Sequence, residues 1–377
     1  MDFAARVSSM SLRTEFIFLS ERDMRAAGVL DAARSVGVAD EVFGLLHSGD
    51  YLMGGPNGNN HGLGLPFPVS SPFPNMPVSG PDRRFVAMPA YVGGRFDVCG
   101  NKWYGSNAAN PQAGLPRSVL TVMLNDRATG EPLALMAANS LSASRTGAVP
   151  GVAVRYLVPA APRRLAVIGC GVINRAAVAA ILSQIAVSSV ACHNRSPENA
   201  ESFVRWLRDD HGVDAHIADS AEDAVRGVDV VTVAASRTAP LEMRADWFAP
   251  EAVILLSGPM RADDELWTTS RIVYDHLPLH AAYVADARGS ADLHAAYAVT
   301  MGGPLYRLID EGKLPTLRDS EDLGGVIAAG DGVTSGRRTV LISCGMAVFD
   351  VAWGLDLLLS ARERALGTTL EFWGDAA

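Results

Sequence analysis

The chain has 377 residues, 49% of them hydrophobic and 19% charged, and its formal net charge is −9. This length allows two domains or one large one, and the composition is that of a globular α/β protein. The negative charge, without any basic run, argues against a nucleic-acid surface. No apolar run approaches the roughly 18 residues of a membrane span, and the first ten residues contain no signal-peptide core. We therefore expect a cytoplasmic protein that binds neither nucleic acid nor a membrane.

The spacing of cysteines and histidines predicts no metal site. The four cysteines are far apart and form no CxxC pair, which is typical of reduced thiols in the cytoplasm. His276 and His280 are the only histidines four residues apart, and no HExxH pattern is present.

The N-terminal part of the chain changes character at a stretch rich in Gly and Pro. Residues 16–19 predict a short strand, and apolar spacing after it predicts two amphipathic helices. Between residues 54 and 81, 13 of 28 residues are Gly or Pro. A loop of this length is uncommon in a compact domain unless it has a function, so we interpret it as a lid or an inter-subunit arm.

Several predicted strands follow this stretch. Residues 84–91 and 95–99 flank Gly93-Gly94, which is typical of a hairpin. Two more predicted strands, 118–124 and 132–136, lead into a predicted helix that runs to Tyr156. These elements predict an antiparallel, β-rich module.

The next segment has the pattern of a dinucleotide-binding βαβ unit. A short apolar run, residues 165–168, meets Gly169 and Gly171, and an alanine-rich helix pattern begins at once. Glycine leaves room for a pyrophosphate beside the backbone amides, and the helix N-terminus favours its charge. Asn174 replaces the third glycine of the usual pattern. An ordinary βα turn of another α/β domain is the alternative.

The end of the second strand bears on the choice of nucleotide. Residues 188–192 predict this strand, which is followed by His193-Asn194-Arg195-Ser196 and contains no carboxylate for the ribose hydroxyls. Arg195 can pair with a 2′-phosphate, which favours NADP(H), with NAD(H) possible. The alternative is a surface arginine in a helix-capping turn, since Ser196-Pro197-Glu198 resembles a helix start.

Further short apolar segments, at 215–218, 228–234, 252–257 and 271–274, alternate with mostly helical patterns and predict a buried parallel sheet. Residues 339–343 predict a last strand, which leads into a long apolar helix over 346–366. The tail from residue 323 is too short for a core of its own, so we expect it to fold back on the N-terminal module.

Several of these stretches resemble the ornithine cyclodeaminase/mu-crystallin family, in the family's order and from about residue 16 to residue 365. Residues 140–148 (Ser-Leu-Ser-Ala-Ser-Arg-Thr-Gly-Ala) are similar to its signature. The segments 88–94, 126–132 and 342–347, with Lys102 and the Gly169 turn, also match. The resemblance implies an α/β fold in which a Rossmann domain (159–322) is inserted in a discontinuous α+β substrate-binding and dimerisation domain (15–158 and 323–377). It also implies a homodimer.

In the family's enzymes, hydride passes between a nicotinamide and the α-carbon of an amino acid. The resemblance implies that Arg145 holds the substrate carboxylate and that Lys102 is a polar anchor or acid, so these two are the candidate catalytic residues. It implies substrate contacts from Met88, Lys102, Arg145, Ser343, Cys344 and Gly345. The expected cofactor contacts are Arg145, Thr146, Gly169, Gly171, Val172, Ile173, Asn174, Asn194, Arg195, Ser196, Ala235 and Ser257.

Two departures from the cyclodeaminase pattern bear on the reaction. Pro259 stands where the catalytic aspartate is expected, and a proline cannot exchange a proton. Asp263 and Asp264 can replace that aspartate only if the loop is rebuilt. Val86-Ala87 stands where cyclodeaminases carry an acidic residue before the Met-Pro pair. These departures argue against ornithine cyclisation.

Three functions remain for this chain. The first is an NAD(P)(H)-dependent imine reductase, amino-acid dehydrogenase or amino-acid-joining synthase, and Lys102-Trp103 is closer to the diaminopropionate-synthase branch of the family. The second is an ornithine or lysine cyclodeaminase. The third is a non-catalytic protein that binds NADP(H) or another ligand.

Overall fold

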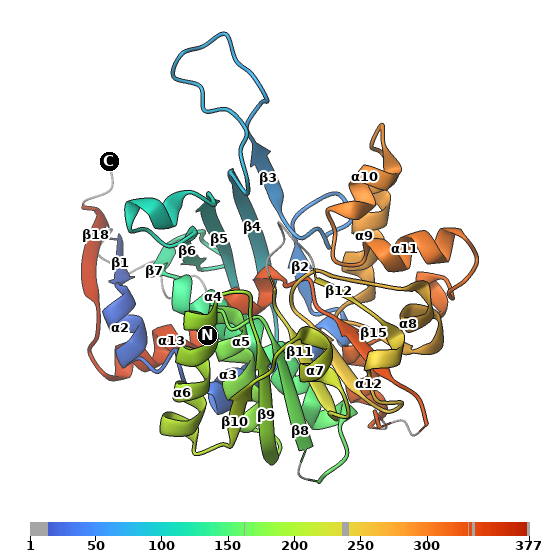
Figure 1. The fold of residues 1–377 in the computed structure, drawn as a ribbon. Helices are drawn as coiled ribbons and strands as arrows, with labels where there is room; N and C mark the ends of the chain where they lie inside the picture. Colours follow the sequence, from blue (N-terminus) through green and yellow to red (C-terminus); the bar gives the residue numbers. More distant parts are fainter. Residues whose placement is uncertain (1–13, 162, 236–240, 331, 334–335, 375–377) are drawn as a thin grey trace.

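The computed structural model describes residues 14–161, 163–235, 241–330, 332–333 and 336–374. Two large sheets lie within this part of the chain, and helices fill the space between them (Figure 1). None of the described helices combines the length and the hydropathy needed to cross a membrane.

The first sheet is antiparallel except where β1 pairs with β7. Its strands, in spatial order, are β18 (Thr368–Trp373), β1 (Thr14–Leu19), β7 (Pro132–Ala137), β6 (Ser118–Asn125), β5 (Val98–Ser106), β4 (Arg84–Val92) and β2 (Tyr51–Met53), and β3 (Leu63–Pro66) also pairs with β4. The helices of this half are α2 (Glu21–Ala26), α3 (Ala32–Ser48), α4 (Asn139–Leu157) and α13 (Ala347–Glu363), with a short 3-10 turn, η1 (Asn110–Ala113).

The alternation of side chains along β4 and β5 decides which residues face the core. Met88 and Lys102 are cross-strand neighbours, and both are buried on the inner face. Trp103 is exposed on the outer face. The inner face packs on α13, whose Phe349 and Trp353 are almost fully buried. Every residue of α13 from Ala347 to Gly354 is buried, which is typical of a helix segment in the centre of a core.

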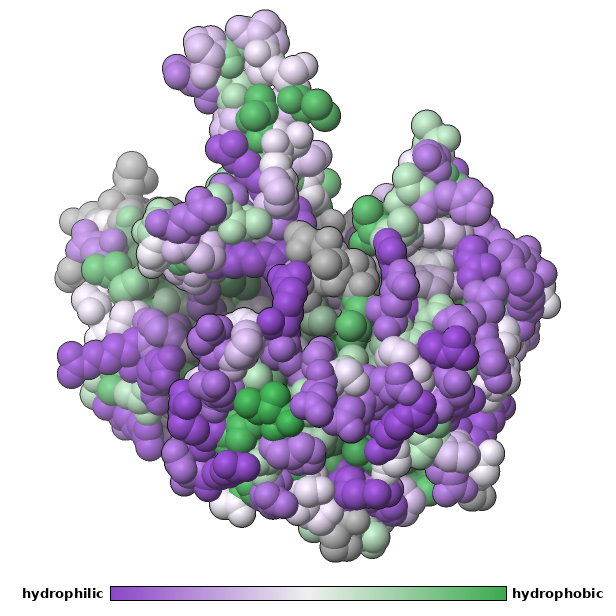
Figure 2. Space-filling model, in the orientation of Figure 1, coloured by the Kyte–Doolittle hydropathy of each residue, from purple (hydrophilic) through white to green (hydrophobic). Residues whose placement is uncertain are grey.

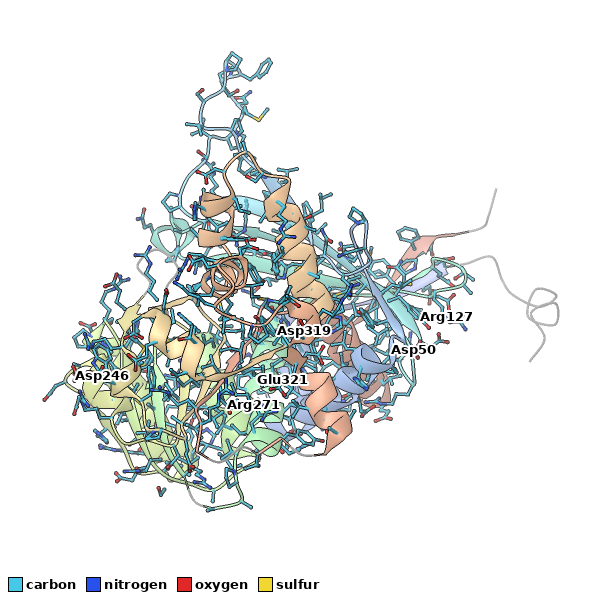
Figure 3. All side chains as sticks on the ribbon, turned by 90° about the vertical axis from the view of Figure 1, so that its right-hand side faces the viewer. Asp50, Arg127, Asp246, Arg271, Asp319 and Glu321 are labelled. Atoms are coloured by element: carbon cyan, nitrogen blue, oxygen red, sulfur yellow. The ribbon has the colours of Figure 1, made fainter. Side chains whose placement is uncertain are left out.

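The second sheet is parallel throughout. Its strands, in spatial order, are β10 (Ala215–Ile217), β9 (Val187–His193), β8 (Arg163–Ile168), β11 (Val230–Val233), β13 (Val253–Leu256), β17 (Thr339–Ile342), β15 (Arg271–Tyr274) and β16 (Glu321–Asp322). The strand order reverses at β8, which creates the crevice where Rossmann folds bind nucleotides. At the far edge, Arg271 pairs with Glu321 through Nε and Nη2, at 2.7 and 2.6 Å (Figure 3).

The helices of this half are α5 (Val172–Leu182), α6 (Pro197–His211), α7 (Ala221–Val225), α8 (Asp264–Thr269), α9 (Leu277–Arg288), α10 (Leu293–Ala298), α11 (Gly303–Asp310) and α12 (Leu323–Ala329). Two 3-10 turns, η2 (Ala245–Trp247) and η3 (Leu317–Asp319), and a two-stranded sheet of β12 (Leu241–Met243) and β14 (Met260–Ala262) complete it.

One part of the C-terminal tail does not fold back on the N-terminal module as expected. β17 lies in the second sheet, between β13 and β15, and all four of its residues are buried. An apolar strand buried on both faces is stable inside a parallel sheet, which explains this placement. α12 packs on α3, and α13 and β18 return to the first sheet, so only β17 of these tail elements lies within the second sheet, across the predicted domain boundary at residue 323.

Helix α4 joins the two halves by close contact with α5. A Cβ atom added to Gly147 would lie 2.3 Å from the backbone of Ala176, and one added to Gly151 would lie 2.9 Å from Ala180 Cβ. Small residues on both helices therefore allow the two backbones to approach. This contact sets the position of Arg145, which lies on α4, relative to the nucleotide turn at the start of α5.

We predict that Gly147→Ala lowers the free energy of unfolding by about 1–3 kcal/mol, because the methyl group overlaps backbone that cannot rotate away. Gly44→Ala on α3 is the matched control, since a Cβ there meets nothing within 4 Å. The control should be neutral or stabilise the protein by up to about 1 kcal/mol. Urea unfolding of both variants checks the prediction, and equal effects would contradict it.

The Gly/Pro-rich stretch divides into two parts. Residues 54–62 lie against the body of the molecule, whereas residues 67–81 form an arm that projects beyond β3 and β4 (Figure 1). Val69 and Phe73 on the arm are 87% and 65% exposed. Apolar side chains are visible along this arm in the space-filling view (Figure 2).

Candidate functional site

Three charged side chains from different elements meet beneath the first sheet. Lys102 lies on β5, Arg145 on α4 and Asp350 on α13, and all three are buried. Lys102 Nζ lies 3.1 Å from Asp350 Oδ2, and Arg145 Nε lies 3.0 Å from Asp350 Oδ1. Lys102 Nζ also lies 3.4 Å from the Ser142 hydroxyl oxygen. The structure therefore brings together the two candidate catalytic residues, and Asp350 links them.

Sequence reasoning misses Asp350, although a signal for it exists. The residue is an acid within the long apolar segment 346–366. A carboxylate in a fully buried stretch of helix needs a cationic partner, because an unpaired buried charge is very costly. Asp350 has two such partners, and none of its surface is exposed.

The cluster formed by Lys102, Arg145 and Asp350 has an excess of positive charge. Burial and the Arg145 guanidinium lower the pKa of Lys102 to about 8, while Asp350 opposes the shift. Arg145 Nε and Nη1 are buried, yet neither makes a hydrogen bond within the described part of the chain. The contact between Arg145 and Asp350 is therefore an ion pair of poor hydrogen-bond geometry. Unmet guanidinium donors beside an uncompensated cation suit a substrate carboxylate.

Two further predicted substrate residues border this cluster. Gly345 follows β17 and has φ +76°, and an added Cβ atom there would lie 2.7 Å from Arg145 Nη1. Met88 is the cross-strand neighbour of Lys102. Ser343 and Cys344 lie in the same turn as Gly345. The predicted substrate residues thus come together, and their roles stay predictions.

The turn after β8 packs closely on β11 and leaves the start of α5 uncovered. Gly169 has φ +93°, and a Cβ atom there would lie 2.7 Å from the Ala234 carbonyl oxygen. Gly171 is the N-cap residue of α5, so no side chain caps the first amides of the helix. Nothing lies within 4 Å of a Cβ atom added to Gly171. The helix start is therefore open to an anion.

The side chain of Asn174 is engaged within the protein, and its predicted cofactor contact stays a prediction. Its side-chain amide donates hydrogen bonds to the carbonyl oxygens of Ile168 (2.9 Å) and Gly169 (2.6 Å). Its Oδ1 atom accepts a hydrogen bond from Thr232 Oγ1 at 2.9 Å. The Asn174 side chain is buried and hydrogen-bonded within the protein, so it stabilises the Gly169 turn.

A cavity of about 730 Å³ opens over this turn. Asn194 accepts a hydrogen bond from the Cys170 amide at 3.0 Å, and Ser196 caps α6. Arg195 is exposed and forms no ion pair with the residues that the structure describes. Six predicted cofactor residues line the cavity: Gly169, Gly171, Asn194, Arg195, Ser196 and Ala235.

The remaining predicted cofactor residues lie around this cavity or beside it. Ser257 follows β13, and its buried hydroxyl has no hydrogen-bond partner in the described part of the chain. Thr146 donates its hydroxyl hydrogen to the Ser142 carbonyl oxygen at 2.6 Å. Val172 lines a neighbouring cavity of about 350 Å³, and Ile173 is half-buried in the first turn of α5.

The two acids after Pro259 do not replace the missing aspartate. Asp263 caps α8 and accepts a hydrogen bond from the Ala245 amide at 3.2 Å. Asp264 pairs with Arg307 and lies 3.4 Å from Lys313 Nζ. Both carboxylates are therefore engaged away from Lys102 and Arg145.

A buried polar network lies behind the 343–345 turn. His280 places its two ring nitrogens 2.8 Å from Asp275 Oδ1 and 2.6 Å from Tyr306 Oη. Asp275 Oδ2 accepts a hydrogen bond from the Cys344 amide at 2.6 Å. Asp275, His280 and Cys344 each place a potential ligand atom within 4.8 Å of the others. Because both Asp275 oxygens already accept hydrogen bonds from the protein, we interpret the group as support for the turn.

The sequence is similar to those of known proteins. The profile of the ornithine cyclodeaminase/mu-crystallin family matches residues 30–365. The chain belongs to this family. It is 28% identical over 305 residues to a Δ(1)-pyrroline-2-carboxylate reductase of Bacillus cereus, which covers 79% of this chain and 88% of the relative.

Two solved structures have a similar fold. The first is Thermococcus litoralis Δ(1)-pyrroline-2-carboxylate reductase in complex with NADH and L-proline (TM-score 0.77, 22% identity, 94% of this chain and 99% of that chain). The second is an archaeal alanine dehydrogenase dimer with bound NAD (TM-score 0.75, 24% identity, 96% of this chain and 100% of that chain). The expected family and the α/β Rossmann fold are confirmed, and the curated relatives are reductases and dehydrogenases, as expected.

Proposed function

We propose that this chain is an NAD(P)(H)-dependent oxidoreductase that transfers hydride at the α-carbon of an amino acid or its imine. The class covers imine reductases, amino-acid dehydrogenases and amino-acid-joining synthases. The observation that carries the proposal is the buried cluster of Lys102, Arg145 and Asp350, which has unmet guanidinium donors and borders the 343–345 turn. Family membership and the reductases among the relatives support it.

Each charged residue of the cluster has a distinct part in this proposal. Arg145 binds the substrate carboxylate through its planar fork of N–H donors. Lys102, held by Asp350 and mostly protonated near neutral pH, anchors a polar group of the substrate. Asp350 keeps both cations in position. A bound nicotinamide supplies or accepts the hydride.

The cavity over the Gly169 turn suits a dinucleotide. Its volume of about 730 Å³ lies within the usual range for cofactor sites. The Gly169 turn and the start of α5 would hold the pyrophosphate, and the buried Ser257 hydroxyl offers an unused hydrogen bond. NADP(H) is favoured over NAD(H), because Arg195 is exposed beside the cavity and the end of β9 carries no acid.

We predict that Arg195→Ala raises the KM for NADPH about 10-fold, which corresponds to the loss of one exposed charge-assisted contact of about 1.4 kcal/mol. The KM for NADH should change less than about twofold. Arg205→Ala on the outer part of α6 is the control, since its nearest described acid is Glu201 at 3.8 Å. Initial rates with both nucleotides check the prediction. An equal effect on NADH and NADPH would contradict the assignment of a 2′-phosphate contact.

The test of the proposed function is a spectrophotometric assay of the purified protein. NADPH and NADH are each mixed with cyclic imines, and with 2-oxo acids plus amines. Net oxidation of either nucleotide supports a reductase or dehydrogenase. Tight nucleotide binding without turnover of any of these substrates would sink the proposal.

The two alternative functions predict different results in such assays. A cyclodeaminase would form proline from ornithine with no net change in the nicotinamide, and the engaged positions of Asp263 and Asp264 argue against it. A pure binding protein would retain nucleotide without turnover. Its best support is the pair of missing carboxylates at Pro259 and at Val86-Ala87.

We also propose a cytoplasmic homodimer. The outer face of the first sheet exposes a row of large apolar residues, and a stacked pair, Phe85 and Trp103, lies in it with ring centroids 5.4 Å apart. A patch of this kind is typical of a surface that another subunit covers. The exposed residues of the row are Phe85, Trp103, Val119 and Met123.

A further inference from the structure

The arm formed by residues 67–81 carries no charged side chain. From residue 51 to residue 81 the chain has no Asp, Glu, Lys or Arg, although 19% of the whole chain is charged. Val69 and Phe73 are 87% and 65% exposed, and Met76 and Val78 are each 43% exposed. A group of exposed apolar side chains without charges among them is typical of a surface that another molecule covers.

The arm has a fixed shape. The Ser79 amide donates a hydrogen bond to the Pro68 carbonyl oxygen at 2.8 Å, which closes the arm at its base. Arg83 donates to the Val78 carbonyl oxygen at 3.1 Å, and its guanidinium carbon lies 5.6 Å from the centroid of the Phe67 ring. Five of the fifteen residues are prolines, whose rings fix φ. Such a segment loses little conformational entropy when it docks on a partner.

The arm points away from the rest of its own chain. In two perpendicular views it projects beyond the ends of β3 and β4 (Figures 1 and 3). In the space-filling view its apolar side chains stand clear of the body of the molecule (Figure 2). A lid would pack on the walls of its own site, whereas the described part of this chain leaves most of Val69 and Phe73 uncovered.

The base of the arm continues into the outer face of the first sheet. The Phe67 and Phe85 ring centroids are 6.3 Å apart, and Phe85 stacks on Trp103. The strand register then extends the apolar row across the whole sheet, from β3 to β18, on the face opposite the core. Exposed members of this row on six different strands are Leu65, Phe85, Trp103, Met123, Phe18 and Leu370. The arm and the outer face are therefore one continuous apolar surface.

A second copy of this chain supplies a matching surface. An apolar sheet face is stabilised when another apolar sheet packs on it, about 10 Å away. The described part of this chain has no other large sheet free for this role, because every residue of β11, β13 and β17 in the parallel sheet is already buried. The outer face of a second copy has the same apolar residues across the same width, so a two-fold axis can pair the two faces. The partner's sheet then lies on the side of Phe67, next to the base of the arm.

We propose that the arm docks on a second copy of this chain, so that the arm and the outer face of the first sheet form one dimer interface. Each subunit extends one arm and receives one, and the exposed side chains of Val69 and Phe73 become buried against the partner. The inference rests on the proposed homodimer and is independent of the proposed hydride transfer.

The deciding variant is the double substitution Val69→Asp and Phe73→Asp, which places two carboxylates on the arm. We expect the Kd of the dimer to rise at least about 30-fold, as for the loss of a central interface residue. Val299→Asp is the matched control, since Val299 is also an exposed valine (79%) but follows α10, and its Kd should stay within threefold of wild type. Trp103→Asp tests the sheet face alone and should also raise the Kd. Sedimentation velocity of the full chain over a dilution series measures all four proteins.

A photo-cross-link tests the position of the arm directly. The photoreactive residue p-benzoylphenylalanine replaces Phe73, and the purified protein is irradiated at a concentration at which it is dimeric. We expect a product of twice the chain mass, and mass spectrometry should join the arm to a peptide of a second chain. A cross-link only within one chain would show that the arm folds on its own body and would overturn the inference.

Two results of the sedimentation series also overturn it, and they can be told apart. If Trp103→Asp dissociates the dimer and the double arm variant keeps the wild-type Kd within threefold, the arm lies outside the interface, whereas the homodimer stands. If the wild-type chain is a monomer at every concentration, the proposed homodimer fails and the role of the arm fails with it. Neither result bears on the oxidoreductase assay.

Discussion

Asp350→Ala is expected to lower the free energy of unfolding by about 3–5 kcal/mol, the cost of breaking a buried ion pair by removing one partner. The variant leaves Lys102 and Arg145 buried, with no carboxylate within 4 Å among the described residues. The change should also disturb activity, since both cations lose the group that holds them. Urea unfolding with and without bound nucleotide measures the loss.

Two further variants separate charge from volume in this experiment. Asp356→Ala removes a carboxylate from the same helix, where Arg34 and Arg95 keep access to water, and should cost about 1 kcal/mol or less. Lys102→Met in the Asp350→Ala background should recover part of the loss, because it removes one unpaired cation. A loss in Asp350→Ala no larger than that in Asp356→Ala would contradict the electrostatic account.

Arg145→Ala is expected to lower kcat/KM for the amino-acid or imine substrate by about 10²- to 10³-fold, or roughly 3–4 kcal/mol. Arg145 Nη1 is buried without a hydrogen-bond partner among the described residues, so a carboxylate bound there loses a charge-assisted hydrogen bond together with the neighbouring positive charge. The fold should survive, because Lys102 and Asp350 remain as a neutral pair. Arg145→Lys should recover only part of the activity, since an ammonium lacks the planar fork.

The pH profile of Arg145→Ala gives a second readout. The Arg145 charge contributes to the lowered pKa of Lys102, so its removal should raise that pKa above about 8. The basic limb of the rate profile, where Lys102 loses its proton, should therefore move to higher pH. Steady-state kinetics over a pH series measures both effects. Unchanged kcat/KM together with an unchanged profile would show that Arg145 is not a substrate ligand.

Much of the site could be predicted from local sequence. The Gly169 turn, the polar end of β9 and the residues around Arg145 are short-range patterns, in which neighbouring residues specify a turn, a strand end or a helix start. The roles of Lys102 and Arg145 are inferred from the resemblance to the family, because a single lysine or arginine has no local pattern that marks its function. The bond that the Asn174 side chain accepts from Thr232, on another strand, is a contact that the local sequence does not indicate.

The sequence by itself determined the family and the parallel sheet, because periodicity and turn chemistry are local properties. Only the tertiary structure decided which distant residues meet. Asp350 reaches Lys102 across 248 positions, and His61 reaches Gly345 across 284. β17 lies in the second sheet although α13, a few residues later, packs on the first. Such contacts depend on how whole elements bury their apolar faces, and no short stretch of sequence encodes that choice.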